Sequence, residues 1–386
     1  MKTSLFALAL FAAQIAAAGV VACRVDVTPS GGSFDEAPQA KVVAQAPGAQ
    51  IQAKSGNRGD WGLAAGAPLF LSDGVGIPSL DELLPQNQRG CLGTGDKLTV
   101  KINEGLWVCG AAANGGAEAN YDFGFAYFPF AEGWIAGHIA ANGKELLASG
   151  NLPEGTTITL LEGGPMAGEI VLRLPGIDAL EDGMLFTVPE ANGDDVSAVG
   201  PLPDGSGWHL RVADEDHNFG DEQRLPLGFV FIPYGLPGLV GGRVGEDGSV
   251  LNASGDFGVC RVAGGRYEIF IPGQTDQDGV LLVEIAKLYP NGVEDNAMAW
   301  AYDPQACGGK GGFVVESYDQ PAFANQDVIF TFAFIPYANT LRGEVPVRKS
   351  SFVARQTWAE SMLAARDELA KQEDFRTGTS PRSVFA

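Results

Sequence analysis

Acidic side chains gather in one loop of this sequence, and their chemistry suits a hard cation. Asp214, Asp216 and Asp221 lie within nine consecutive positions, 214–222, together with two glutamates and a histidine. Carboxylate oxygens at this density are ligands that Ca²⁺ accepts. The spacing lacks the full EF-hand order, so a solvated surface turn is the simpler interpretation. The turn at residues 276–279 has the same two interpretations.

Five cysteines offer a second kind of chemistry. Cys23 follows Val-Val-Ala and resembles the acylated residue of a bacterial lipobox, which leaves Cys91, Cys109, Cys260 and Cys307 as an even set. Cys91 and Cys109 lie within the first of three predicted units, and Cys260 and Cys307 lie within the third. In an oxidising compartment each pair could close a disulfide worth about 2–4 kcal/mol. The alternative is that all four are buried free thiols.

Catalytic motifs are absent from the sequence. His138, His209 and His217 have no metal-binding spacing, and neither a Gly-x-Ser-x-Gly elbow nor a phosphate loop occurs. His138 is replaced by Arg243 at the matching position of a later repeat, which predicts a surface position. A polysaccharide-degrading enzyme would need a pair of carboxylates that sequence cannot identify. We therefore predict no catalysis, and no cofactor other than calcium.

Several aromatic residues could stack on sugar rings. Aromatic residues in the strands of a β-sandwich more often belong to the core, so we favour the core interpretation. The residues in question are Trp134, Trp208, Trp300 and Tyr318.

A short aromatic strand ending in proline occurs three times. Its prolines, Pro129, Pro233 and Pro336, lie 104 and 103 residues apart. A fixed period on this scale indicates a tandem array of similar domains. The three copies occupy residues 125–130, 229–234 and 332–337.

Further blocks repeat between the second and third copies, and all of them have the pattern of strands. Residues 168–176 match 265–273, residues 182–185 match 278–281, and Trp208 matches Phe313. Tyr267, Ile269 and Ile271 alternate with outward positions, and turn residues recur about every 8–12 positions. We predict an all-β chain of tandem antiparallel, jelly-roll-like β-sandwiches. Their predicted ranges are 41–130, a divergent unit, then 131–235 and 236–338.

The two ends of the chain differ from the predicted sandwiches. Residues 1–22 have a basic start and an apolar run, as export signals do, with cleavage either after Ala18 or before Cys23. The even number of cysteines that remains without Cys23 favours the second position. Residues 23–40 are predicted to be a spacer. Residues 339–386 are predicted to be a linker, an amphipathic helix and a tail, because Trp358, Met362, Ala365 and Leu369 recur at helical spacing.

Net charge limits the partners of this chain. A formal charge of −22 argues against nucleic acid, because no basic patch is available to release counterions. No other apolar run has membrane-crossing length, so membrane attachment is expected only through a lipid on Cys23. We predict a secreted or cell-surface protein, lipid-anchored to a bacterial outer membrane if Cys23 is acylated.

One family resemblance rests on residues of the last repeat. Residues 242–249 (Gly-Arg-Val-x-x-Asp-Gly-Ser), 257–261 and 265–269, followed by a closing Phe-x-Phe-Ile-Pro-Tyr, resemble the repeats of bacterial surface and tail-fibre proteins. Those repeats are similar to the jelly roll of the complement globular head and the tumour necrosis factor type. The resemblance implies a jelly roll, often trimeric, used for display, adhesion or assembly. It implies no ligand residues.

Two functions are consistent with these patterns. The first is an exported structural or adhesive surface protein, acting through surface proteins or as a homotrimer. The second is a carbohydrate-binding surface protein, assisted by calcium in the acidic loop. In both, we expect separate pleated units strung in series, with no reaction centre.

Overall fold

A computed structural model describes most of the chain between residues 20 and 337. The described residues are 20–28, 39–45, 51–55, 61–65, 74–80, 97–103, 106–113, 117–119, 123–130, 133–162, 169–189, 196–213, 226–289, 292–293, 297–318 and 324–337. The predicted export signal before residue 20 and the predicted C-terminal helix lie outside them.

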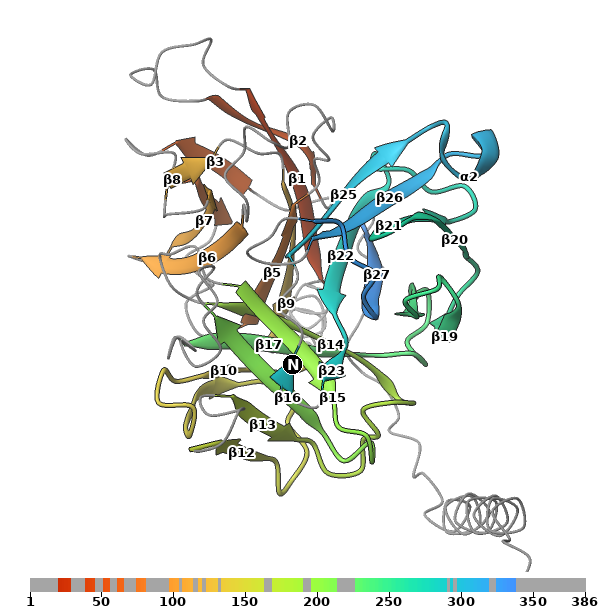
Figure 1. The fold of residues 1–386 in the computed structure, drawn as a ribbon. Coiled ribbons are helices and arrows are strands. Elements are labelled where there is room, and N and C mark those ends of the chain that lie inside the picture. Colours follow the sequence, from red (N-terminus) through yellow and green to blue (C-terminus); the bar gives the residue numbers. More distant parts are fainter. Residues whose placement is uncertain are drawn as a thin grey trace, which may run out of the picture. The chain divides into compact units, whose positions relative to one another are not determined.

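The described residues form three successive groups of strands, which we call the first, second and third units (Figure 1). The first unit contains β1 (Val21–Thr28), β2 (Gln39–Gln45), β3 (Ile51–Ser55), β4 (Trp61–Ala65), β5 (Gly74–Leu80), β6 (Lys97–Asn103), β7 (Leu106–Ala113), β8 (Ala117–Ala119) and β9 (Phe123–Pro129). The second unit contains β10 (Ile135–Ile139), β11 (Leu146–Ser149), β12 (Thr157–Leu160), β13 (Ile170–Arg173), β14 (Gly183–Pro189), β15 (Val196–Pro201), β16 (Trp208–Ala213) and β17 (Leu227–Pro233). The third unit contains β18 (Val240–Val244), β19 (Val250–Ser254), β20 (Gly258–Ala263), β21 (Arg266–Phe270), β22 (Gly279–Ile285), β23 (Leu288–Tyr289), β24 (Gly292–Val293), β25 (Ala297–Asp303), the short helix α2 (Ala306–Gly309), β26 (Gly312–Tyr318) and β27 (Phe330–Pro336).

All three units have the same topology. One antiparallel sheet, which we call the central sheet, has the order β2-β1-β9-β5, β11-β10-β17-β14 or β19-β18-β27-β22. The other, the outer sheet, has the order β3-β4-β7-β6, β12-β13-β16-β15 or β20-β21-β26-β25, and β8 adds to β7. The register agrees as well, because Gly74, Gly183 and Gly279 pair with the three repeat prolines. The predicted all-β sandwich architecture is confirmed.

The aromatic strands form the centre of each sandwich. In β17, Phe229 and Phe231 point into the core between the two sheets of the second unit, where Trp208 also lies. In β27, Phe330 and Phe332 do the same in the third unit. Each of these two units therefore has a hydrophobic core of its own, as the length of the repeat predicted.

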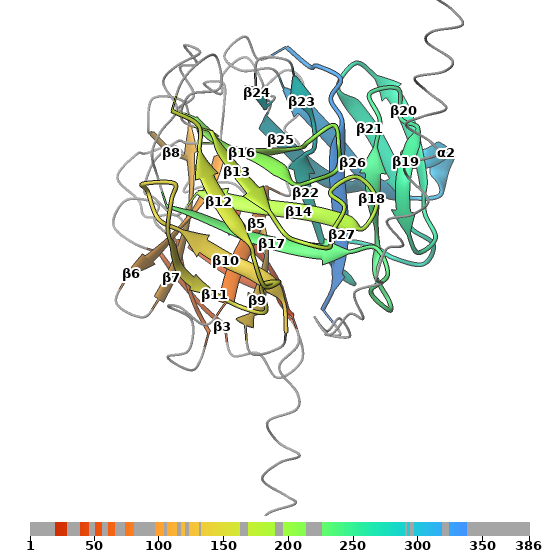
Figure 2. The same cartoon turned by 90° about the horizontal axis from the view of Figure 1, so that it is seen from below.

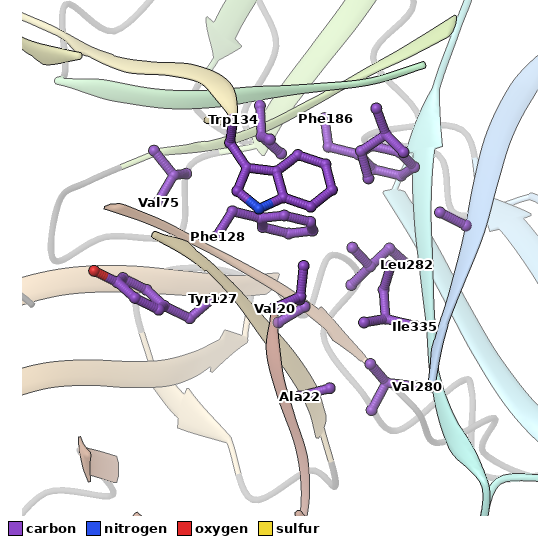
Figure 3. Close-up of a cluster of buried hydrophobic side chains, with 14 of the residues drawn as sticks. Val20, Ala22, Val75, Tyr127, Phe128, Trp134, Phe186, Val280, Leu282 and Ile335 are labelled. Atoms are coloured by element: carbon purple, nitrogen blue, oxygen red, sulfur yellow. The ribbon is translucent and has the colours of Figure 1, made fainter. Parts of the chain in front are cut away.

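A third hydrophobic core belongs to all three units together. It contains equivalent residues of the aromatic strands, Phe128, Ile232 and Ile335, and equivalent residues of the strands beside them (Figure 3). Those neighbours are Val75, Met184 and Val280. We call this cluster the shared core. It covers the face of each central sheet that is turned away from its own sandwich.

Contacts between the units follow a closed cycle. β6 of the first unit contacts β14 of the second, β15 of the second contacts β22 of the third, and β25 of the third contacts β5 of the first. Strands β5, β14 and β22 also contact one another pairwise, and both views place them between the units (Figures 1 and 2). Each unit therefore presents the same two surfaces to its neighbours, which is how a three-membered cyclic assembly closes.

Two expectations from the sequence are corrected here. The units are not independent bodies in series, because the described residues of all three belong to one compact unit around the shared core. The predicted spacer, 23–40, contains most of β1 and the start of β2, which pair with each other and with β9. The sandwich therefore begins earlier than residue 41, since Val20 and Ala22 are already buried in the shared core.

Candidate functional site

Several predicted site residues lie where the structure gives no side-chain description. The calcium candidates Asp214, Asp216 and Asp221 lie between β16 and β17, outside the described residues. Cys91 lies outside the described residues as well. Cys23 lies in β1 and Cys109 in β7, where only the backbone is described. Calcium binding, lipidation and the Cys91–Cys109 disulfide therefore stay predictions.

The outer sheet of the third unit carries the one constellation of predicted site residues that the structure brings together. Cys260 in β20 stands opposite Glu268 in β21. Cys307 lies in the turn between β25 and β26, and its amide donates a hydrogen bond to the carboxylate of Glu268. Glu268 thus links the two cysteines, which are 47 positions apart in the sequence.

The two thiols of this site lie near each other. Cys260 and Cys307 are both free cysteines, and Cys260 is close enough to contribute to the raised pKa of Cys307. Burial raises the pKa of Cys307 to about 11, with further contributions from Cys260 and the nearby Glu268 carboxylate. Nucleophilic cysteines need a lowered pKa, so this environment does not activate Cys307 for catalysis at neutral pH. It does place two thiols near each other.

A buried ion pair lies on the same outer sheet. Arg266 Nη1 is 2.9 Å from Glu316 Oε1, and Glu316 is fully buried and also accepts a hydrogen bond from the Tyr318 hydroxyl. At the equivalent positions of the second unit the charges are exchanged, with Glu169 in place of Arg266 and Arg211 in place of Glu316. Opposite charges at the same two positions indicate a role in holding adjacent strands together.

His209 belongs to the second unit's version of this arrangement. Its Nδ1 lies 2.9 Å from Glu169 Oε2, and both side chains are buried. His138 is buried as well, against the ring of Phe130, so the predicted surface position for His138 is wrong. At the matching position of the third unit, Arg243 Nη2 donates a hydrogen bond to the Ala286 carbonyl oxygen at 3.2 Å.

Residues 265–269, which supported the family resemblance and begin Gly-Arg-Tyr, have a structural explanation. Gly265 has φ of +62°, and a Cβ there would lie 2.6 Å from the Ser317 carbonyl oxygen. Asp327 accepts bonds from the Gly265 amide (2.8 Å), the Tyr267 hydroxyl (3.2 Å) and the Arg261 guanidinium (2.6 and 2.8 Å). The hydrogen bond from Arg261 is the main cause of the lowered pKa of Asp327. The motif fixes the turn between β20 and β21.

The predicted turn at residues 276–279 is likewise structural. Asp278 Oδ2 accepts hydrogen bonds from the amide (2.9 Å) and the hydroxyl (2.8 Å) of Thr275. The Asp278 carbonyl accepts the amide of Tyr337, just as the Asp182 carbonyl accepts the amide of Tyr234 in the second unit. The Asp278 side chain closes its own turn, so the solvated-turn interpretation is favoured here.

The three candidate tryptophans are core residues, as favoured from the sequence. Trp134, Trp208 and Trp300 are at most 2% exposed. The alternative interpretation, that these three residues stack on sugar rings, is therefore excluded. Tyr318 is partly exposed, with its hydroxyl bonded to Glu316.

Three broader comparisons complete the description of the site. No protein-family model, curated protein or solved structure matches this chain. Among the described residues, no helix is long and apolar enough to cross a membrane. The same residues contain no cluster of three or more histidine, cysteine or acidic side chains arranged to hold a metal ion.

Proposed function

We propose that this chain is an exported cell-surface protein with a structural or adhesive role, in which three β-sandwich units act as one block. The observation that carries the proposal is the shared core. Equivalent strands from all three units meet there, so the central sheets of the second and third units are apolar on both faces. Such extensive burial suits a rigid building unit, and the polar pairs of the outer sheets have structural roles.

The arrangement is the single-chain equivalent of a homotrimer. The family resemblance implies jelly rolls that trimerise, and each unit here is built on two antiparallel sheets with a common order of four strands each. Here the second and third units supply the surfaces that two further chains would supply in a homotrimer. The central faces are thereby occupied, and we propose that one chain functions alone at this surface.

Carbohydrate binding is the less favoured alternative. Its aromatic support is lost because Trp134, Trp208 and Trp300 lie in hydrophobic cores. What supports it now is the acidic loop with Asp214, Asp216 and Asp221, as a calcium site. No described residue group adds to that support.

Light scattering coupled to size-exclusion chromatography tests the single-chain assembly. We expect the mass of one chain, about 40 kDa or less after processing, across a wide range of concentrations. A stable mass of three chains would contradict the proposal, because the central faces would then not be satisfied within one chain.

Protease treatment of intact source cells tests the location. We expect loss of the protein from intact cells or its recovery in the medium, while a cytoplasmic control protein stays uncut. Binding of the labelled purified protein to cell envelopes tests adhesion. Full protection in intact cells, together with no envelope binding, would exclude a surface role.

A further inference from the structure

We propose that Cys260 and Cys307 form a disulfide that clamps the exposed edge strand β20 to the β25–β26 turn. The inference is independent of the proposed surface function. The cysteine count suggested the pair, and the structure now supplies the positions of the sulfurs, the residues that hold them and the element that the bond would fasten.

Both cysteines lie beside the same residue, Glu268. Cys260 faces the outer side of the sheet in register with Glu268, and the Glu268 carboxylate binds the amide of Cys307. The turn that carries Cys307 contacts β21 and β26, so it lies over the middle of the outer sheet. The strand register and this hydrogen bond therefore bring Cys260 and Cys307 to the same part of the outer sheet.

The turn makes room for the sulfur of Cys307. A Cβ on Gly312 would lie 3.2 Å from Cys307 Sγ and 2.8 Å from the Ile269 carbonyl oxygen, so only glycine leaves this space. Cys307 itself has φ of +53°, and among the described residues it is the one non-glycine residue with positive φ. Glycine adopts that conformation without strain, as Gly308 and Gly309 do beside it. A cysteine at such a position indicates that its sulfur is used.

The clamp would act on a vulnerable element. β20 is an edge strand of the order β20-β21-β26-β25, and most of its residues are exposed, including Val262 at 48%. An exposed edge strand can pair with strands of other molecules. A bond from Cys260 to the turn would hold β20 in place and close a loop of 47 residues around β21, β22 and β25.

Oxidation of the two thiols requires an oxidant, and a small disulfide is sufficient. The thiolate of one cysteine attacks oxidised glutathione, forms a mixed disulfide and releases one glutathione. The thiolate of the other attacks the protein sulfur of that mixed disulfide and displaces the second glutathione. Two protein thiols and one oxidised glutathione thus give one protein disulfide and two reduced glutathiones. The exposed Cys260 is the accessible site for the first attack.

Thiol trapping in the full-length protein tests the bond. The protein is equilibrated with oxidised glutathione, denatured, alkylated and analysed by mass spectrometry. We expect both cysteines to resist alkylation and a peptide containing Cys260 to be linked to one containing Cys307. In C260S and in C307S the remaining cysteine should become alkylated or carry glutathione. Free alkylation of both in the wild type, or linkage of either to Cys91 or Cys109, would overturn the proposal.

Thermal unfolding separates a clamp from an incidental bond. Reduction should lower the Tm of the C91S/C109S variant, which retains only this pair besides Cys23, by about 5–10 °C. The Tm of the matched C260S/C307S variant should lack the contribution of the Cys260–Cys307 bond. An equal Tm of C91S/C109S with and without reductant would show that the bond does not stabilise the fold.

Discussion

The carboxylate of Glu284 in the third unit accepts two hydrogen bonds from Thr187 in the second unit. Glu284 Oε2 lies 2.9 Å from the Thr187 amide nitrogen and 3.0 Å from its hydroxyl oxygen, although the residues are 97 positions apart. Both side chains are buried. The register places Val188 and Ser79 at the positions equivalent to Glu284 in the other units. Of these three equivalent positions, Glu284, at the contact between the second and third units, is therefore the one that carries an ionisable group.

Glu284 should make the stability of the protein depend on pH. Burial raises its pKa to about 8 from an ordinary value of 4.5, against the hydrogen bonds from Thr187, which lower it. Between these two values the native state keeps a proton that the unfolded state has lost. The free energy of unfolding should therefore fall as pH rises from about 4.5 to about 8, by a few kcal/mol.

Urea denaturation of E284Q and the wild type at several pH values checks this dependence. The difference in the free energy of unfolding between the two should change across the interval, because glutamine does not titrate. E145Q, a change at an exposed position, should follow the wild type. A constant difference between E284Q and the wild type from pH 5 to 8 would contradict the buried, raised pKa.

Phe128 and Trp134 should be as important to stability as any residue inside one sandwich. Their rings lie 4.9 Å apart at an interplanar angle of 82°, and they come from the first and second units (Figure 3). F128A should lower the free energy of unfolding by about 3–5 kcal/mol, as expected for a buried Phe. Calorimetry should show one transition for all three units, shifted as a whole. L147A, at a residue 63% exposed, serves as the control and should stay within about 0.5 kcal/mol.

Independent units would give a different calorimetric result. Phe128 would then be exposed on the first unit, and F128A would have a small effect on one of several transitions. Separate transitions, with F128A moving at most one of them, would therefore contradict the shared core.

The repeated strands were predictable because their pattern is local. Alternation of Phe229 and Phe231 with smaller residues, closed by Pro233, predicts a strand with one face in a sandwich core. The residues between them, Val230 and Ile232, are apolar as well. A strand that is apolar on both faces is buried on both faces, and this was the available signal for the shared core.

The partner of the second face could not be read from the sequence. An apolar face can be covered by another chain, by another unit or by a helix, and the pattern of a strand is the same in each case. Glu284 and Asp327 had no local signal either, because their partners lie 97 and more than 60 positions away. The two cysteines were found by counting, since covalent pairing restricts the alternatives in a way that packing does not.

Gly124 should tolerate no large side chain, because the first and third units approach closely there. A Cβ on Gly124 would lie 3.1 Å from Val280 Cβ and 3.6 Å from Trp300 Cζ2. G124V should lower the free energy of unfolding by about 1–3 kcal/mol through overpacking. Denaturant unfolding measures the change, with G235A as the control, since nothing lies within 4 Å of a Cβ on Gly235. An unchanged midpoint for G124V would show that the two units do not touch at this strand.

Of the two predicted processing positions, cleavage after Ala18 should be the one used. Val20 and Ala22 are fully buried in the shared core, and Val21 pairs with Tyr127 of β9. Cleavage before Cys23 would remove these residues. The fold would then lose a stabilisation of about 25 cal/mol for each Å² of apolar surface that they bury. N-terminal sequencing and intact mass of the exported protein check the position.

Two versions of the chain, one beginning at Gly19 and one at Cys23, give the matched comparison. The version from Gly19 should have the higher Tm, because it keeps the first residues of β1 in the shared core. A mature protein that begins with an acylated Cys23 and is as stable as the longer version would show that this part of β1 is dispensable. The lipid anchor would then be the correct interpretation of Cys23.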